Sequence, residues 1–355
     1  MRMHPVPLLL MLAATLPAME LAPGFSVDGW VEATGRAEGR EPLSPRPALD
    51  AERDEGRHAI DAAAAAALIA TYRVDDLRLR ADVIVSDQPQ FADSDSNVLL
   101  EQAFIDWQMD AQVTWRAGRF QTTWLGWEAF HTAGLWRVNH SAAWDWNVQN
   151  HSLQPNQPFV SDGVGLLTAT ADQRWRAEFY VVDDVLGDTD QTRGTDLTTG
   201  ASFSGHMDAL GRVELGLAYD PRSVAAGANR ATHAFAVDLN ADLTAWREQG
   251  WFFAAEVQFH HHPDLTVGDE RYGNDLVVLA MANRRLVDDL SLTVMLDYVD
   301  RGLSADDNAV FETAVALMAQ PRPYLRWHAE AFYWAEQADR ADSYGVAAVV
   351  NVALP

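Results

Sequence analysis

The sequence contains no cysteine and no lysine, so all 26 of its strongly basic residues are arginines. Without cysteine the chain has no disulfide framework, no thiol nucleophile and no cysteine ligand for a metal. Positive charge is also scarce, because 51 acidic residues give the chain a formal net charge of -25 at pH 7. Nucleic acids and anionic lipid head groups both require clustered positive charge on a binding protein, and this composition therefore argues against both as partners.

Long apolar runs are equally scarce beyond the N-terminus. No later segment approaches the ~20 consecutive apolar residues that a membrane-spanning helix needs. The first residues have the form of a secretory leader, in which a basic start precedes the apolar run 6–16 and Ala18 or Ala22 provides the cleavage position. Several prolines argue against the alternative of a buried N-terminal helix. We therefore expect 1–22 to be a signal peptide and 23–355 to be an exported protein, either soluble or embedded in an outer membrane as a barrel.

Most of the exported chain alternates apolar and polar residues with a period of two, which indicates half-buried β-strands. Segment 77–86 is the clearest case, with apolar residues at odd positions from Leu77 to Val85 and charged residues at even positions such as Arg78 and Asp82. Similar segments lie at 174–181, 212–219, 235–240, 253–260, 290–298, 325–333 and 344–352. With less regular segments they make about sixteen strands of about ten residues, the even number and the length expected of an outer-membrane barrel.

The connections between these segments alternate between short joints and long loops. The long connections are 37–58, 87–96, 121–159, 184–195, 220–230, 261–273, 300–307 and 336–342. A meandering barrel with both termini in the periplasm has short turns at one end and long loops at the other. A secreted β-sandwich or solenoid gives no reason for this alternation. The predicted fold is all-β: a transmembrane, antiparallel, up-and-down β-barrel of about sixteen strands, with a long third loop folded inward.

Four segments fit this pattern less well. The run of alanines within 59–73 favours a helix on propensity alone. It leads through a short joint into the clear strand 77–86, however, so we expect a strand here too. For the strands near 97–109, 277–283 and 310–317, the sequence does not fix which face points inward.

A barrel in lipid must place its charged residues in the lumen, because charge on the lipid face costs ~2–4 kcal/mol at mid-depth. The predicted pore-lining residues are Arg78, Arg80, Asp82, Arg116, Arg174, Arg176, Glu178, Arg212, Glu214, Asp238, Glu256, Asp297, Arg326, His328 and Glu330. The basic members concentrate on the early strands, and the later strands supply more of the acidic members. Two interpretations are open: opposed walls of unlike charge that orient solutes in a transverse field, and simple pairing between neighbouring strands.

The longest connection, 121–159, shows no strand alternation and is rich in tryptophan. A loop of this length is uncommon in a compact fold unless it is functional, and in a barrel it can fold inward and narrow the lumen. The residues predicted at this constriction are Trp127, Glu128, Arg137 and Asp145. The aromatic residues of the loop either stack on sugar rings or pack the loop against the inner wall.

No pattern in the sequence predicts catalysis or metal binding. His260, His261 and His262 are adjacent, and successive side chains on a strand point to opposite faces, so at most two of the three converge. No carboxylate stands at a zinc-ligand spacing, and no nucleophile motif such as G-x-S-x-G is present. We therefore expect no enzyme activity, no metal and no cofactor.

The segments AFIDWQ, TWRAGRF, LGWE, PNQPF, SDGVGL and VVDDVLGD, spread over about 96–185, resemble the outer-membrane β-barrel porin family of the OmpL-like type. Members of that family carry a G-[KR]-F element followed by a G-[YW]-E element, which here are Gly118–Phe120 and Gly126–Glu128. The resemblance implies a porin in the outer membrane, with polysaccharide-export barrels as a nearby relative. The chain departs from many outer-membrane barrels at its end, where Pro355 stands in place of a terminal aromatic residue.

These observations together predict a passive, water-filled channel for small hydrophilic solutes in the outer membrane of a Gram-negative-type envelope. Its expected partners are the lipid bilayer, the solutes and, as a homo-oligomer such as a trimer, further copies of the chain. The first alternative is a substrate-selective saccharide or polysaccharide channel. The alternative from another class is a secreted, soluble, β-rich binding protein.

Overall fold

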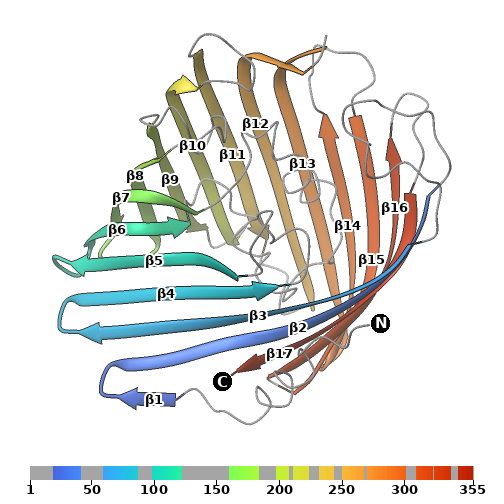
Figure 1. Ribbon diagram of the computed structural model, residues 1–355, viewed down its shortest axis with the longest axis horizontal. Helices are drawn as coiled ribbons and strands as arrows, with labels where there is room; N and C mark the ends of the chain where they lie inside the picture. The colour runs from blue at the N-terminus through green and yellow to red at the C-terminus, as the bar shows by residue number, and fades with distance from the viewer. Residues whose placement is uncertain are drawn as a thin grey trace.

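A computed structural model of the protein describes residues 19–40, 59–86, 98–121, 160–183, 197–207, 211–223, 232–243, 250–267, 270–300, 309–322, 324–336 and 343–354. These ranges form an all-β structure (Figure 1). Within them, no helix has the length and apolarity needed to cross a membrane.

All strands belong to one antiparallel sheet that follows the order of the chain. The strands are β1 (Met19–Ala22), β2 (Phe25–Arg40), β3 (Ala59–Val74), β4 (Leu77–Ser86), β5 (Val98–Gln108), β6 (Val113–Gln121), β7 (Val160–Ala169), β8 (Trp175–Asp183), β9 (Leu197–Met207), β10 (Gly211–Ser223), β11 (Thr232–Leu243), β12 (Trp251–Val267), β13 (Glu270–Val287), β14 (Leu290–Asp300), β15 (Ala309–Arg322), β16 (Leu325–Glu336) and β17 (Ser343–Leu354). Each strand from β2 onward pairs with the next one along the chain, which is the up-and-down meander that the alternating connections predicted.

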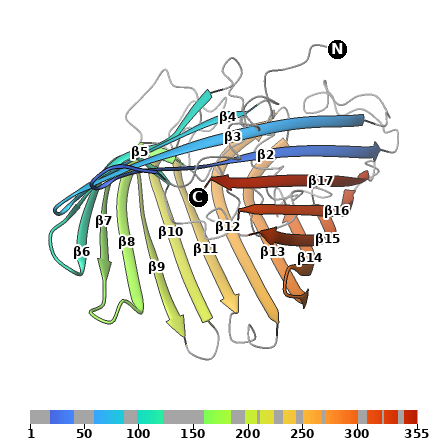
Figure 2. The same cartoon turned by 90° about the horizontal axis from the view of Figure 1, so that it is seen from below.

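The sheet closes on itself because the last strand pairs with the second. Register partners run along the seam from Ser343 and Arg40 to Leu354 and Gly29. Figure 2 shows β2 lying between β3 and β17. The 17-stranded sheet therefore contains a closed ring of sixteen strands, β2 to β17, and the short β1 pairs with the start of β2. Closure leaves no open edge among the ring strands, which is what a lipid environment requires.

The two faces of the ring have the reverse of the polarity found in water-soluble proteins. Large apolar side chains on the outer face are highly exposed: they include Leu68, Leu100, Ile105, Phe179, Leu217, Leu296, Phe311, Val315 and Val350. Charged and polar side chains on the inner face are buried: they include Glu32, Asp82, Asp106, Glu178, Glu214, Asp297, Glu312, Glu330 and Asn351. A soluble monomer rarely exposes contiguous apolar surface on this scale.

Aromatic residues on the outer face gather towards the strand ends. Near the short connections lie Trp107, Trp115 and Trp175, with exposed fractions of 51%, 44% and 51%. Near the long connections lie Tyr333 and Tyr344, with exposed fractions of 42% and 50%. Two such bands are typical of a barrel that meets both interfaces of a bilayer.

Strand β3 shows how tertiary pairing overrides helix propensity. Its alanine run is a strand along its whole length, as predicted, and it pairs with β2 from Ala59 to Tyr72 and with β4 from Ala65 to Val74. A helix here would satisfy its own backbone but would open the ring and leave the facing N–H and C=O groups of both neighbours unpaired.

The structure corrects one predicted loop. Residues 261–273 were expected to connect two strands, but β12 continues to Val267 and β13 begins at Glu270. The pairing of these strands shifts between His261 and Leu265, and Pro263 lies within this irregularity. Proline has no N–H to donate and is tolerated in a sheet at such a bulge, so the pairing resumes beyond it.

The G-[KR]-F element has a structural reason in this fold. Gly118 has a φ of 123°, and a Cβ on it would lie 2.4 Å from the carbonyl oxygen of Ala103 on the neighbouring strand. Only glycine permits this backbone and this approach. Two residues further on, the ring of Phe120 is fully buried.

Candidate functional site

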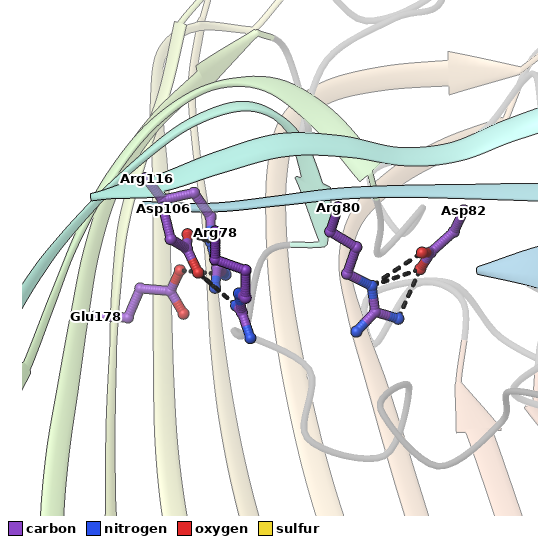
Figure 3. Close-up of polar contacts among 6 residues, drawn as sticks. All are labelled: Arg78, Arg80, Asp82, Asp106, Arg116 and Glu178. Carbon is purple, nitrogen blue, oxygen red and sulfur yellow. Dashed lines mark hydrogen bonds and ion pairs between the residues drawn. The ribbon is translucent and has the colours of Figure 1, made fainter. Parts of the chain in front are cut away.

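The inner wall of β4 to β8 carries a cluster of ion pairs centred on Asp106 (Figure 3). Arg78 donates to Asp106 from β4, and Arg116 donates from β6 with its Nε 2.8 Å from Oδ1. Arg78 pairs in register with Asp106, and Asp106 pairs in register with Arg116, so the three side chains form one row across three strands. One carboxylate therefore holds two guanidinium groups.

Arg116 contacts a second carboxylate and two aromatic rings of this wall. Its Nη1 lies 3.5 Å from Oε1 of Glu178 on β8. The guanidinium carbon lies 4.4 Å from the ring centre of Phe104 and 5.5 Å from that of Phe120, distances at which a cation is attracted to an aromatic face. The side chain is only 12% exposed. We infer that Arg116 braces this wall.

A second ion pair lies further along β4. Arg80 donates to both oxygens of Asp82, with distances of 2.9 Å from Nε to Oδ1 and 2.6 Å from Nη2 to Oδ2. Gln102 on β5 donates to the same carboxylate at 3.1 Å. Asp82 is buried, while the Arg80 side chain remains one-third exposed. Pairing between neighbouring residues therefore accounts for the described arginines of β4 and β6.

The wall formed by β14 to β16 is predominantly acidic. Asp297 and Glu312 are register partners on β14 and β15, and both are fully buried. On β16, Nε2 of His328 lies 3.5 Å from Oε2 of Glu330, and both side chains are buried. In the ring of sixteen strands, β14 stands eight strands beyond β6, so this acidic wall faces the arginine-rich one across the barrel.

The other predicted lining residues are placed as follows. Arg174 is exposed in the turn before β8, and Arg176 is exposed at the start of that strand. Arg326 is half-buried on the inner face of β16. The side chains of Arg212, Asp238 and Glu256 lie outside the described residues. Segment 122–159, with Trp127, Glu128, Arg137 and Asp145, lies outside them as well.

Sequence reasoning missed several inner-face residues, above all Asp106, Glu312 and Glu32. Asp106 and Glu312 lie on strands whose facing the sequence left open. For Asp106, the signal was available in the outward pair Ile105 and Trp107, which are exposed by 47% and 51% on either side of it.

A polar cavity of about 610 Å³ opens beneath the Asp106 cluster, towards the short turns. Its lining comes from β3 to β10 and contains arginines and carboxylates in nearly equal number, with hydroxyl and amide groups between them. We call this cavity the recess. None of the described residues that line it is aromatic.

The described part of the chain contains no group of three or more histidine and acidic side chains placed to hold a metal ion. The three adjacent histidines lie within β12.

No known protein-family model matches the sequence, and no curated protein sequence matches it. Solved structures do resemble its fold. The outer membrane channel DcaP of Acinetobacter baumannii has a TM-score of 0.66 at 11% identity, over 95% of this chain and 100% of that one. The anion-selective porin from Comamonas acidovorans has a TM-score of 0.66 at 12% identity, over 93% and 99%. The trimer form of OmpT, an outer membrane protein of Vibrio cholerae, has a TM-score of 0.59 at 12% identity, over 92% and 99%. The chain thus shares the barrel fold of outer-membrane porins and channels.

Proposed function

We propose that this protein is an outer-membrane channel through which small hydrophilic solutes diffuse passively. The observation that carries the proposal is the inverted polarity of a closed ring, apolar and exposed outside, charged and buried inside. In water this apolar outer face would be exposed to solvent, whereas in a bilayer it contacts lipid. Every ring strand is also paired on both sides, as a lipid environment requires. The porins and channels that share the fold support the same assignment.

A ring of sixteen strands is wide enough to hold water along its axis. Charged side chains such as Asp82, Glu178 and Glu330 are stable in its inner wall only if that wall meets water or other charges. We assign the pore lining to the predicted residues on this wall and the constriction to the segment 122–159. The channel performs no turnover chemistry in this proposal.

A saccharide-selective channel is the second candidate, because the tryptophans on which sugar rings could stack belong to 122–159, which lies outside the described residues. The other alternative receives less support. A secreted binding protein would expose the apolar outer face to water.

Assembly, export and family membership belong to the proposal too. The trimer form of a protein with this fold supports a homotrimer.

Strand β1 pairs with β2, so we place the end of the leader before Met19, at Ala18 and not at Ala22. N-terminal sequencing of the mature protein distinguishes these two positions. The structural role of Gly118 and Phe120 in the G-[KR]-F element supports the OmpL-like assignment.

The function is tested by the swelling of liposomes that contain the purified protein. We expect swelling rates to fall steadily as the size of a neutral sugar increases, with no saturation by any one sugar. A saturable rate for one sugar would favour the saccharide channel, and no swelling would contradict a pore.

Shortening the segment 122–159 is expected to raise the size limit, and an unchanged limit would contradict its role as the constriction.

A further inference from the structure

A histidine and a carboxylate lie side by side in the acidic wall of β14 to β16. His328 and Glu330 are two positions apart on β16, so their side chains share one face of the strand. Nε2 of His328 lies 3.5 Å from Oε2 of Glu330, and both side chains are buried. Trp327, between them and Arg326 in the sequence, is exposed on the outer face. The pair therefore belongs to the inner wall.

The remaining neighbours of His328 are apolar or uncharged, with one exception. Its register partners are Met318 on β15 and Val349 on β17. The diagonal neighbours on these strands do not titrate either: Ala316, Ala347 and Asn351. On β16 itself, Arg326 occupies the side of His328 away from Glu330. Among the described residues of these three strands, Arg326 and Glu330 are thus the charged groups that face His328.

The charge of the pair depends on one proton. With that proton the pair is neutral overall, whether the imidazole or the carboxylate carries it, and without it the pair has one negative charge. Histidine is the side chain whose ordinary titration falls between about pH 5 and pH 8. A rise in pH through this range therefore adds one negative charge to the acidic wall.

A charge at this position acts on the ions that pass through the lumen. Buried charges are screened by salt less than exposed ones. In water, a unit charge ~10 Å from a monovalent ion changes the local concentration of that ion about two-fold. A negative charge on the inner wall raises the concentration of potassium and lowers that of chloride.

We propose that His328 and Glu330 together determine how the ion selectivity of the channel depends on pH, with a stronger preference for cations at high pH. This inference rests on the proposed channel function and assigns part of its selectivity to one pair of side chains. The neighbouring Arg326 keeps its charge throughout this range, so the change in charge comes from the pair.

The test measures the reversal potential of the full-length protein in planar bilayers that separate two potassium chloride solutions of equal pH. The mean salt concentration is kept near about 0.1 M, where a charge acts over ~10 Å. For the natural sequence, we expect the ratio of potassium to chloride permeability to rise about two-fold between about pH 5 and pH 8. A ratio that does not change with pH would overturn the inference.

Two variants separate the roles of the pair. His328→Gln is expected to keep the permeability ratio of the natural protein at high pH and to lose the rise, because the glutamine side chain does not titrate. Glu330→Gln removes the negative charge that the pair gains at high pH. Its ratio at high pH is therefore expected to fall to the value that the natural protein has at low pH.

The matched control is His206→Gln, which removes an exposed histidine near the end of β9, outside the acidic wall. It should keep the rise in the permeability ratio. An equal loss of the rise in His206→Gln and His328→Gln would overturn the assignment to the pair, as would a full rise in His328→Gln.

The outcomes separate this inference from the function on which it rests. Absence of any potassium chloride current in the natural protein would contradict the channel itself, whereas a normal current with a constant permeability ratio would overturn the role of the pair alone. If His328→Gln does not insert, Glu330→Gln decides. A ratio at high pH equal to that of the natural protein would then overturn the inference.

Discussion

The ring of Tyr180 on β8 lies over Gly200, its register partner on β9. A Cβ on Gly200 would lie 2.1 Å from this ring, and the Tyr180 hydroxyl donates to the carbonyl of Leu217 on β10 at 3.4 Å. One side chain thus spans three strands, and the missing side chain of the glycine makes room for it. The same relationship joins Phe332 to Gly345 across β16 and β17.

Gly200→Ala is therefore expected to destabilise the barrel. The added methyl group forces the Tyr180 ring away from its position, and overpacking of this kind costs about 1–3 kcal/mol. The free energy of unfolding, measured by tryptophan fluorescence during urea titration in lipid vesicles, checks this. The control is Gly35→Ala, because a Cβ there meets nothing within 4 Å; equal effects of the two substitutions would contradict the packing.

Asp106→Asn tests the ion-pair cluster. The amide cannot neutralise Arg78 and Arg116, and the loss of a partner for a nearly buried arginine is expected to lower the free energy of unfolding by roughly 3 kcal/mol. Asp162→Asn is the matched control, because its contact with Arg119 is 3.8 Å long and both side chains are over one-third exposed. That substitution should change stability by less than about 1 kcal/mol, and a similar loss for both would contradict the central role of Asp106.

Much of this architecture was predictable from the sequence, and the failures have physical reasons. Alternation predicted the facing of β4, because its charged residues all take even positions while every odd position from Leu77 to Val85 is apolar. On β5 the same rule fails, because apolar Phe104 points inward to contact Arg116 while Ile105 points outward. A register shift at Asp82 and Val83 adds to the irregularity. Asp106 was therefore missed.

Pairing between distant parts of the chain was beyond the reach of local patterns. The seam between β2 and β17 joins residues from opposite ends of the sequence. No local pattern in either segment identifies the strand with which it pairs. The row of Arg78, Asp106 and Arg116 depends in the same way on the register of three strands. Periodicity gives the face on which a residue lies, but not the residue opposite it.

The acidic wall predicts an effect on ion selectivity. Glu312→Gln removes a lumen charge opposite Asp297, so the local concentration of cations should fall. The reversal potential in a potassium chloride gradient should therefore shift towards the equilibrium potential of chloride. Asp300→Asn removes the same charge from the outer face of β14 and serves as the control. A shift of equal size in both variants would show that the wall has no local influence.

The turn before β8 predicts a pH dependence. The pKa of Asp172 is held below its usual value, because the Thr170 hydroxyl and the Arg174 N–H both donate to its carboxylate. A lowered pKa means that the stabilisation is present above the unfolded-state value and is lost as the pH falls through the folded-state value. In a titration followed by NMR, Thr170→Val should raise the pKa of Asp172 towards the usual value; no change would contradict the hydrogen bond as the main cause.

The most direct test of a closed, water-filled barrel is the single-channel current of the purified protein in planar bilayers. We predict discrete current steps whose conductance rises in proportion to the conductivity of the potassium chloride solution, because the ions move through bulk-like water inside the ring. Protein that inserts into the bilayer and produces no steps above the lipid background would contradict this account.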